Sequence, residues 1–188
     1  RFSDELSTLL SPKFANTRSD FERTLKQRNT LLKSLGRRNP SSQARATLDA
    51  WDEQLIQYGS EIIFTRLENI ERIQPHVFDF GTTISADTEP LNLSYTNTWL
   101  PPQARDKTEI ANYYKTELEN RSKDEVERGA TLVGPHRDDV NIELSEMPAK
   151  GYASHGQSWS IAIALRLAAF KTLREHDDDP ILILDDVF

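Results

Sequence analysis

Two long stretches near the start of the chain place apolar residues at helical spacing. In residues 13–35, apolar side chains recur at intervals of three, four and seven and form one stripe: Phe14, Phe21, Leu25, Leu32 and Leu35. Residues 43–78 carry a second stripe: Leu48, Trp51, Leu55, Ile62, Leu67, Ile70, Ile73 and Val77. Gly36 and the turn-forming segment Asn39–Ser42 separate the two. The pattern predicts two long helices joined by a short polar loop, an antiparallel helical hairpin.

The second part of the chain mixes short apolar segments with helical ones. Leu91–Tyr95 alternates apolar and polar residues, as a half-buried strand does, and Ile181–Leu184 is wholly aliphatic, as a central strand is. We also expect helices at Arg105–Arg128 and at Trp159–Leu173, the latter apolar almost all round and therefore buried, and strands at Thr131–Val133 and Val140–Leu144. This order predicts an α/β fold, with a helical arm over residues 1–80 and an α/β layer over residues 81–188.

Composition narrows the class of protein. The 188 residues are 37% hydrophobic and 28% charged, and they include no cysteine, which excludes disulfides and thiolate metal sites. No apolar run approaches the roughly 18–20 residues that span a bilayer, so we expect a cytoplasmic protein without membrane contact. The chain begins at Arg1 and stops at Phe188, directly after an aliphatic run and two acids, which we interpret as a piece of a longer protein.

Charge is distributed unevenly along the chain. The formal net charge is −7, but the segment Lys13–Arg38 holds eight basic and two acidic residues, a net of +6, which leaves −13 for the remainder. Such asymmetry orients a molecule on a polyanion, and it makes Arg23, Lys26 and Lys33 candidates for contacts with DNA phosphates. The alternative is a solvated helix face whose cations pair with acids at positions 49–71 of the second helix.

Two acids, Asp185 and Asp186, directly follow the aliphatic run Ile181–Leu184. An aliphatic strand that ends in acids resembles the Walker B motif, in which the first acid helps to hold Mg²⁺ against the nucleotide phosphates and the next position polarises the attacking water. Such carboxylates meet the metal at the C-terminal edge of a parallel sheet. The alternative is a strand followed by two solvated acids in a turn.

A glycine-containing segment, Gly151–Ser158, precedes the apolar helix. It fits the spacing GxxxxGx[ST], but Gln157 stands where a phosphate-binding loop has its lysine, so we reject that interpretation. Its part Ser154-His155-Gly156-Gln157 resembles the signature of ABC ATPases, where exposed N–H groups at a helix N-terminus and a serine hydroxyl bind an anion. A capping box formed by Ser154 and Gln157 explains the same residues, and both interpretations stay open.

The spacing of the two motifs favours a nucleotide-binding protein. From Gln157 to Asp185 there are 28 positions, enough for one long helix, a short charged loop and a strand. ABC-type ATPases place signature, helix and Walker B in this order. The pair therefore resembles part of an ABC/SMC-like ATPase head.

Three further segments resemble the RecF family of bacterial recombination mediators. They are Thr131–Asp139 (TLVGPHRDD), Lys150–Gln157 (KGYASHGQ) and, in the basic helix, Gln27–Lys33 (QRNTLLK). The resemblance covers essentially the whole chain and implies part of an ABC/SMC-like ATPase head with an inserted antiparallel helical arm. It further implies an ATP-dependent homodimer that binds single- and double-stranded DNA at gaps. Such a protein loads the recombinase together with other mediator proteins and serves DNA replication, repair and the SOS response to DNA damage.

The resemblance also assigns roles to single residues. Ser154, Gly156 and Gln157 match the signature and would face the γ-phosphate of ATP bound by the opposite protomer. Asp185 matches the acid that binds Mg²⁺, and Asp186 stands at the catalytic position, where most ABC ATPases have glutamate. The shorter side chain fits a weak ATPase. Because the family's phosphate-binding lysine has no counterpart here, we expect the isolated chain neither to bind ATP tightly nor to hydrolyse it.

Other interpretations stand beside this one. His136 and Arg137 fit a structured turn with a satisfied salt bridge as well as a position near nucleotide or DNA. His76 and His176 have no second ligand at metal spacing, so we expect no metal role for them. Two other functions compete for the whole chain: another SMC-like chromosome-associated ATPase head, and a helical protein-interaction module with a vestigial ATPase half. The short arm argues against an SMC-like chromosome-associated ATPase head, because such proteins have much longer heptad arms.

Overall fold

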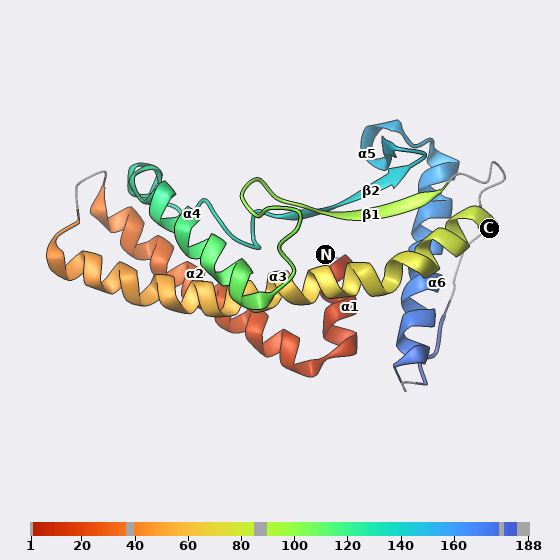
Figure 1. The fold of residues 1–188 in the computed structure, drawn as a ribbon, viewed down its shortest axis with the longest axis horizontal. Helices are drawn as coiled ribbons and strands as arrows, with labels where there is room; N and C mark the ends of the chain where they lie inside the picture. Colours follow the sequence, from red (N-terminus) through yellow and green to blue (C-terminus); the bar gives the residue numbers. More distant parts are fainter. Residues whose placement is uncertain (1, 37–39, 85–89, 177–178, 184–188) are drawn as a thin grey trace. The chain divides into compact units, whose positions relative to one another are not determined.

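The computed structural model describes residues 2–36, 40–84, 90–176 and 179–183, and these residues form mostly helices with one small sheet (Figure 1). The sheet has three strands in the order β1-β2-β3. No helix in these ranges is long and apolar enough to cross a membrane. The elements are α1 (Phe2–Leu10), α2 (Pro12–Leu35), α3 (Ser42–Ile84), β1 (Leu91–Thr96), α4 (Lys107–Arg128), β2 (Asp139–Leu144), β3 (Met147–Pro148), α5 (Ala149–Tyr152) and α6 (His155–Glu175).

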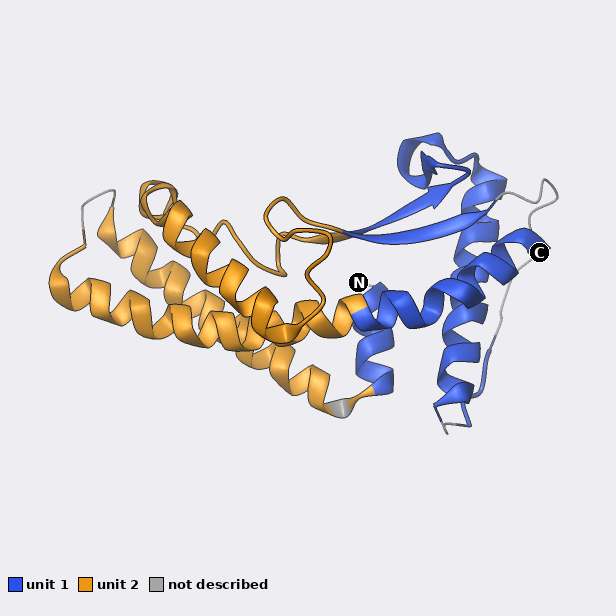
Figure 2. Ribbon diagram, in the orientation of Figure 1, with its two compact units in different colours: residues 1–10, 68–95, 140–188 blue, residues 11–67, 96–139 orange. Residues whose placement is uncertain are grey.

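The chain divides into two compact units, each assembled from segments that are separated in sequence (Figure 2). Unit 1 comprises residues 1–10, 68–95 and 140–188, and unit 2 comprises residues 11–67 and 96–139. The division differs from the boundary that we expected after residue 80. Residues 96–139 group with the helical hairpin because α4 packs against α2, whereas the end of α3 groups with the sheet.

Unit 2 contains the predicted helical hairpin. Helix α2 ends at Gly36, whose left-handed backbone (φ 56°) suits glycine and directs its N–H to the Lys33 carbonyl. Its apolar stripe meets that of α3 in a small core, as the spacing predicted. The buried side chains of that core are Phe14, Phe21, Leu55 and Ile62.

Two glycines of unit 2 make room for one aromatic ring. The Tyr114 side chain is fully buried and donates a hydrogen bond to the Val133 carbonyl at 3.2 Å. A Cβ atom at Gly59 would lie 2.4 Å from Tyr114 Cε1, and one at Gly134 would lie 2.1 Å from Tyr114 Oη. Gly134 also has a φ of 123°. The ring therefore fits only because both positions lack a side chain.

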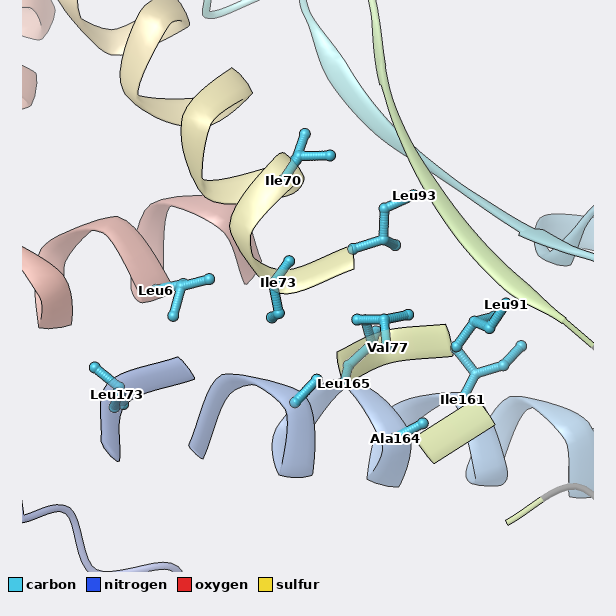
Figure 3. Packing of buried hydrophobic residues seen from close by; sticks show 11 residues of the cluster. Leu6, Ile70, Ile73, Val77, Leu91, Leu93, Ile161, Ala164, Leu165 and Leu173 are labelled. Atoms are coloured by element: carbon cyan, nitrogen blue, oxygen red, sulfur yellow. The ribbon is translucent and has the colours of Figure 1, made fainter. Parts of the chain in front are cut away.

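Unit 1 is built on a core between the end of α3, α1, β1 and α6 (Figure 3). Gln74 of α3 ties the strand to this core, because its Nε2 donates to the Leu91 carbonyl at 3.1 Å and its Oε1 accepts from the Leu93 N–H at 2.8 Å. The buried residues of the core are Leu6, Ile70, Ile73, Val77, Leu91, Leu93, Ile161, Ala164, Leu165, Ala168 and Leu173.

The sheet confirms two of the predicted strands. β1 and β2 contain Leu91–Tyr95 and Val140–Leu144, and in β1 the buried Leu91 and Leu93 alternate with the more exposed Asn92 and Ser94, as expected. β2 and β3 form an antiparallel hairpin in which Leu144 pairs with Met147. The two turn residues, Ser145 and Glu146, have positive φ angles of 49° and 67°, which match the right-handed twist of a two-residue hairpin.

Three expectations about secondary structure need correction, and α1, β3 and α5 were not predicted. Thr131–Val133 is a loop rather than a strand. Helix α6 buries only one face, since Trp159 is 42% exposed. Ile181–Ile183 is neither a strand nor buried, and the exposed fractions of Ile181 and Ile183 are 88% and 83%. No strand in the described ranges pairs with this run, and of its three residues only Leu182 is half-buried.

Candidate functional site

The segment that resembles the ABC signature lies at the N-terminus of α6. Ser154 is the N-cap, and its Oγ accepts a hydrogen bond from the Gln157 N–H at 3.2 Å. The Gln157 Oε1 accepts in turn from the Ser154 N–H at 2.8 Å. This reciprocal pair is a capping box, so that interpretation of the sequence is confirmed as a structural fact.

The capping box leaves an identifiable set of donors for an anion. The N–H groups of His155 and Gly156 have no carbonyl partner within the helix, since they belong to its first turn. The hydroxyl proton of Ser154 stays available because Oγ acts only as an acceptor in the capping box. Ser154, His155 and Gly156 are exposed, and a Cβ at Gly156 would meet nothing within 4 Å. An anion such as a nucleotide phosphate can therefore approach this backbone closely.

The predicted metal and catalytic acids, Asp185 and Asp186, lie outside the described residues, as does Leu184. Within the described ranges there is no group of three or more histidine or acidic side chains that could hold a metal ion. His76 instead lies 2.8 Å from the Glu175 carboxylate, which agrees with the ordinary role expected for it.

The candidate DNA-binding residues lie on the exposed surface of α2. Lys26 and Lys33 are exposed, and no ion pair is seen for either among the residues that the structure describes. Arg23 is exposed as well, but its guanidinium pairs with Asp20. The alternative interpretation placed the partners of these cations at positions 49–71 of the second helix, whereas the partner of Arg23 lies on its own helix and neutralises it there.

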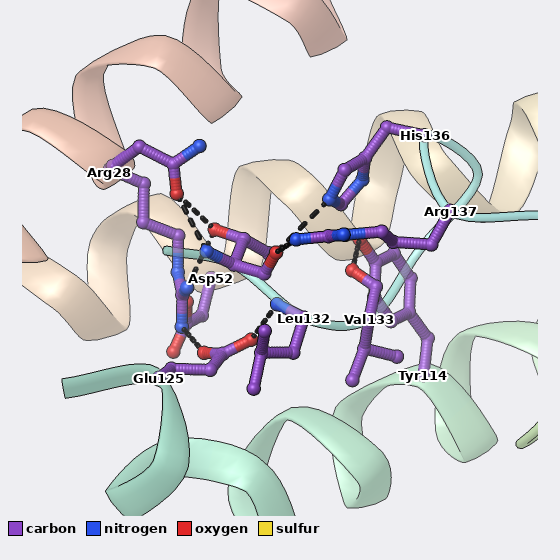
Figure 4. A network of polar contacts seen from close by, with 10 residues as sticks. Arg28, Asp52, Tyr114, Glu125, Leu132, Val133, His136 and Arg137 are labelled. Atoms are coloured by element: carbon purple, nitrogen blue, oxygen red, sulfur yellow. Dashed lines mark hydrogen bonds and ion pairs between the residues drawn. The ribbon is translucent and has the colours of Figure 1, made fainter. Parts of the chain in front are cut away.

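A fourth cation of α2, Arg28, is buried rather than solvated. Its side chain is 3% exposed, its Nε lies 2.5 Å from Asp52 Oδ1, and its Nη2 lies 2.7 Å from Glu125 Oε2 (Figure 4). Burial raises the pKa of Glu125, and the guanidinium and the Leu132 N–H oppose that rise. Arg28 thus joins α2 to α3 and α4, and it does not contribute to a basic surface.

The same group of side chains holds the loop after α4 in place. Arg28 Nη1 donates to Thr131 Oγ1 at 2.9 Å, and the Thr131 N–H donates to Asn29 Oδ1 at 2.7 Å. The Leu132 N–H donates to Glu125 Oε1 at 2.7 Å (Figure 4). These N–H groups have side-chain acceptors instead of a neighbouring strand, which is why the apolar run Thr131–Val133 does not form one.

His136 and Arg137 form a structured turn over this loop, as one interpretation expected, but the salt bridge that it included is not seen among the described residues. The His136 Nε2 lies 3.2 Å from the Thr131 carbonyl, and the ring contacts Phe21 with 5.9 Å between centroids. Partial removal from water lowers the pKa of His136 to about 4, and nearby guanidiniums, that of Arg137 most strongly, add to the shift. His136 is therefore neutral at pH 7. Arg137 donates to the Thr131 carbonyl at 3.4 Å and not to a carboxylate of the described residues.

The sequence analysis did not predict the ion pair between Arg28 and Glu125, although the position of each residue on its helix indicates that it is buried. Arg28 lies three positions after Leu25 and four before Leu32, inside the apolar stripe of α2. Glu125 lies seven positions after Leu118, on the face of α4 that buries Leu118. Charged residues of opposite sign on two buried faces indicate an internal ion pair.

Comparisons with known proteins decide which family these features represent. No family model matches the sequence. Along its whole length, however, the chain is 44% identical to the DNA replication and repair protein RecF of Cutibacterium acnes, 45% to RecF of Streptomyces avermitilis and 37% to RecF of Rhodococcus erythropolis. The chain is a RecF homologue. It spans about half of these relatives, 51% of the length of each.

The similarity to RecF extends to its three-dimensional structure. The solved structure of the recombination mediator protein RecF–ATP in the RecFOR pathway matches 99% of this chain with a TM-score of 0.89 and 27% identity. The match covers 49% of that RecF chain. It confirms the expected fold class, part of an ABC/SMC-like ATPase with a helical arm. The segment TLVGPHRDD, which suggested RecF in the sequence, is the loop that the Arg28 network holds.

Proposed function

We propose that the full-length protein containing this chain is a RecF-type recombination mediator that acts in DNA replication and repair. The observation that carries this proposal is the likeness to RecF–ATP over 99% of the chain. In this function the protein binds DNA at gaps in an ATP-dependent manner, loads the recombinase with other mediators, and contributes to the SOS response in the cytoplasm. Neither alternative is favoured, since the named relatives are all RecF proteins and not SMC proteins or interaction modules.

The two units have different roles in this proposal. Unit 1, with the candidate signature and the segment that leads to Asp185, is part of the ATPase head. Unit 2 is the inserted arm and includes α4 as well as the hairpin. The unequal charge of the units supports this assignment. Unit 2 has 17 basic and 15 acidic residues, a net of +2, whereas unit 1 has 6 basic and 15 acidic residues, a net of −9.

The signature segment is proposed to act across an ATP-dependent homodimer. Ser154, Gly156 and Gln157 then face ATP held by the opposite protomer, with the Ser154 hydroxyl and the free N–H groups of the first turn directed at its γ-phosphate. Gln157 contributes by holding the Ser154 backbone through the capping box. Asp185 is the proposed Mg²⁺ ligand, and Asp186 the proposed catalytic acid of a weak ATPase.

Replacing Ser154 by arginine in the full-length protein tests this role. Arginine fills the open space at the helix N-terminus and removes the hydroxyl, so ATP-dependent dimerisation is expected to disappear, together with ATP-dependent binding to gapped DNA. ATP binding by the monomer is expected to persist, since the signature serves the opposite protomer. Light scattering with and without ATP measures the dimer, and equilibrium titration measures nucleotide binding.

The matched control for this variant is Ser94→Arg, the same change at an exposed position of β1 in the same unit. It is expected to dimerise normally. If Ser154→Arg dimerises with ATP as the wild type does, Ser154 has no role at the dimer interface. A wild-type protein whose binding to gapped DNA does not respond to ATP would contradict the proposed function itself.

A second test concerns DNA binding by α2. Changing Arg23, Lys26 and Lys33 to glutamine in the full-length protein is expected to weaken binding to duplex DNA. The slope of log K against log salt is expected to fall by about 0.9 for each phosphate that the variant no longer neutralises. Because Arg23 already pairs with Asp20, we expect the three residues together to neutralise about two phosphates. Affinities measured at several salt concentrations give the slope.

The control triple variant changes Arg45, Lys107 and Lys115 of the same unit to glutamine, with the same loss of charge. These cations lie beside carboxylates, since Lys107 pairs with Glu61 and the other two line a groove with Asp49 and Glu119. They are expected to leave the slope unchanged. Equal slopes for the α2 variant and the wild type would mean that this surface of α2 does not contact DNA.

A further inference from the structure

A pocket of about 270 Å³ in unit 2 gathers three guanidiniums between α4, the loop after it and the segment after β1. Arg121 and Arg128 come from α4, and Arg137 comes from the turn that the Arg28 network positions. Glu117 and Asp124 also line the pocket. The indole of Trp99 forms part of its wall, and the Trp99 Nε1, which is buried, has no hydrogen-bond partner in the described part of the chain.

One of the three arginines, Arg121, forms ion pairs with both carboxylates of the pocket. Arg121 Nε lies 2.8 Å from Glu117 Oε1, and Arg121 Nη1 lies 3.8 Å from Asp124 Oδ2. For Arg128 and Arg137 no ion pair with a carboxylate is seen among the described residues. Arg137 donates to the Thr131 carbonyl at 3.4 Å, a neutral acceptor that leaves its positive charge unbalanced. Arg128 and Arg137 thus line one pocket without an ion pair of their own among the described residues, since its two carboxylates pair with Arg121.

We propose that this pocket binds a phosphate group of the DNA backbone, with Arg128 and Arg137 as the residues that contact it. The proposal rests on the proposed function, because it names a place where the arm contacts DNA. A guanidinium presents paired N–H donors that match two oxygens of a phosphate, and two guanidiniums around one anion make that match from both sides. The volume of about 270 Å³ suits a single phosphate with its sugar rather than a folded protein segment.

The position of the pocket connects it with the candidate DNA-binding residues of α2. Arg128 is the last residue of α4, and Gly129 follows it. A Cβ at Gly129 would lie 3.4 Å from the Cα of Lys33, so the end of α4 lies against α2 at that residue. The exposed Lys33 and the proposed phosphate pocket therefore belong to neighbouring parts of one surface, along which successive phosphates of a strand can bind.

A second, larger groove of the same unit has a different balance of charges, and the comparison explains why the arginine pocket favours an anion. The groove between α3 and α4 has a volume of about 690 Å³ and is lined by four carboxylates, those of Asp49, Asp52, Glu53 and Glu119, and two cations. Burial raises the pKa of Asp52, the Arg28 guanidinium opposes that rise, and the charges of Asp49 and Glu119 add to it. Phosphate is repelled from that groove, and Lys115 at its edge provides a control residue.

The test measures the affinity of the full-length protein for duplex DNA and for single-stranded DNA at several salt concentrations. Arg128→Gln and Arg137→Gln are each expected to reduce affinity roughly tenfold, the effect of one charged hydrogen-bonding contact, and to lower the salt slope by about 0.9 on duplex or about 0.7 on single strands. Arg128→Lys keeps the charge and is expected to retain the slope. Lys115→Gln, the same loss of charge on the same helix, is expected to behave as the wild type.

Further measurements separate the possible outcomes. Inorganic phosphate is expected to compete weakly with DNA, to the same extent for the wild type and for Lys115→Gln. If the wild type binds inorganic phosphate tightly and Arg128→Gln keeps its DNA affinity, the pocket binds a free anion, and the proposal is overturned. Unchanged DNA affinity and slope in both arginine variants would overturn it as well. If the wild type itself fails to bind DNA, the proposed function fails, which is a different result. Thermal unfolding checks that each variant is folded.

Discussion

Asp186→Asn in the full-length protein is expected to slow ATP hydrolysis by roughly 10²–10⁴-fold, the contribution of a positioned acid–base group. The change keeps the size of the side chain and removes the charge that would polarise the attacking water, so ATP binding and ATP-dependent dimerisation are expected to persist. Single-turnover hydrolysis measures the chemical step, and nucleotide titration measures binding.

The control is Asp179→Asn, which removes the same charge from an exposed position a few residues earlier. It is expected to hydrolyse ATP at the wild-type rate. Asp185→Asn, by contrast, is expected to weaken nucleotide binding that depends on Mg²⁺, because Asp185 is the proposed metal ligand. If Asp186→Asn hydrolyses ATP as fast as the wild type, another residue activates the water and the Walker B interpretation of Asp186 is wrong.

Arg28→Met is expected to destabilise unit 2 by about 3–5 kcal/mol, because it leaves a buried carboxylate without its cation. Glu125 is 0% exposed, so its charge cannot be solvated once Arg28 is gone. The loop that contains Thr131 and Leu132 is expected to loosen as well, since Arg28 and Glu125 are two of its side-chain anchors. Chemical denaturation of the full-length protein measures the destabilisation, and hydrogen exchange at the Leu132 amide reports the loop directly.

Two variants distinguish a buried ion pair from a general effect of charge removal. Arg23→Met removes a surface arginine that pairs with Asp20, and it is expected to cost no more than about 1 kcal/mol. The double variant Arg28→Met, Glu125→Leu removes both buried charges and is expected to recover much of the stability of the wild type. A double variant less stable than Arg28→Met would contradict the assignment, because it would show that Glu125 stabilises the fold without Arg28.

The helices were predictable because the information that specifies them is local. Apolar residues at intervals of three and four define which face of α2 and α3 is buried, and glycines after α2 and α4 end those helices in the left-handed conformation that other residues avoid. Gly36 was expected to separate the two helices of the hairpin, and it ends α2. The hairpin of unit 2 follows from these features.

The loop Thr131–Val133 and the run Ile181–Ile183 show where local patterns fail. Each is a short apolar segment, and such segments are compatible with a strand. Whether a strand forms depends on a neighbour that accepts its hydrogen bonds, and the sequence does not reveal that neighbour. The Thr131 N–H finds Asn29, 102 positions away, and Ile181 and Ile183 lie exposed to water.

The sequence by itself determined the helices α2, α3, α4 and α6, two strands of the sheet and the likeness to RecF. Only the tertiary structure decided the grouping of residues 96–139 with the hairpin, the burial of Arg28, and the meeting of Arg128 with Arg137 at one pocket. The reason is physical. Periodicity records which face of an element is apolar, whereas an ion pair or a pocket depends on which distant elements that face packs against.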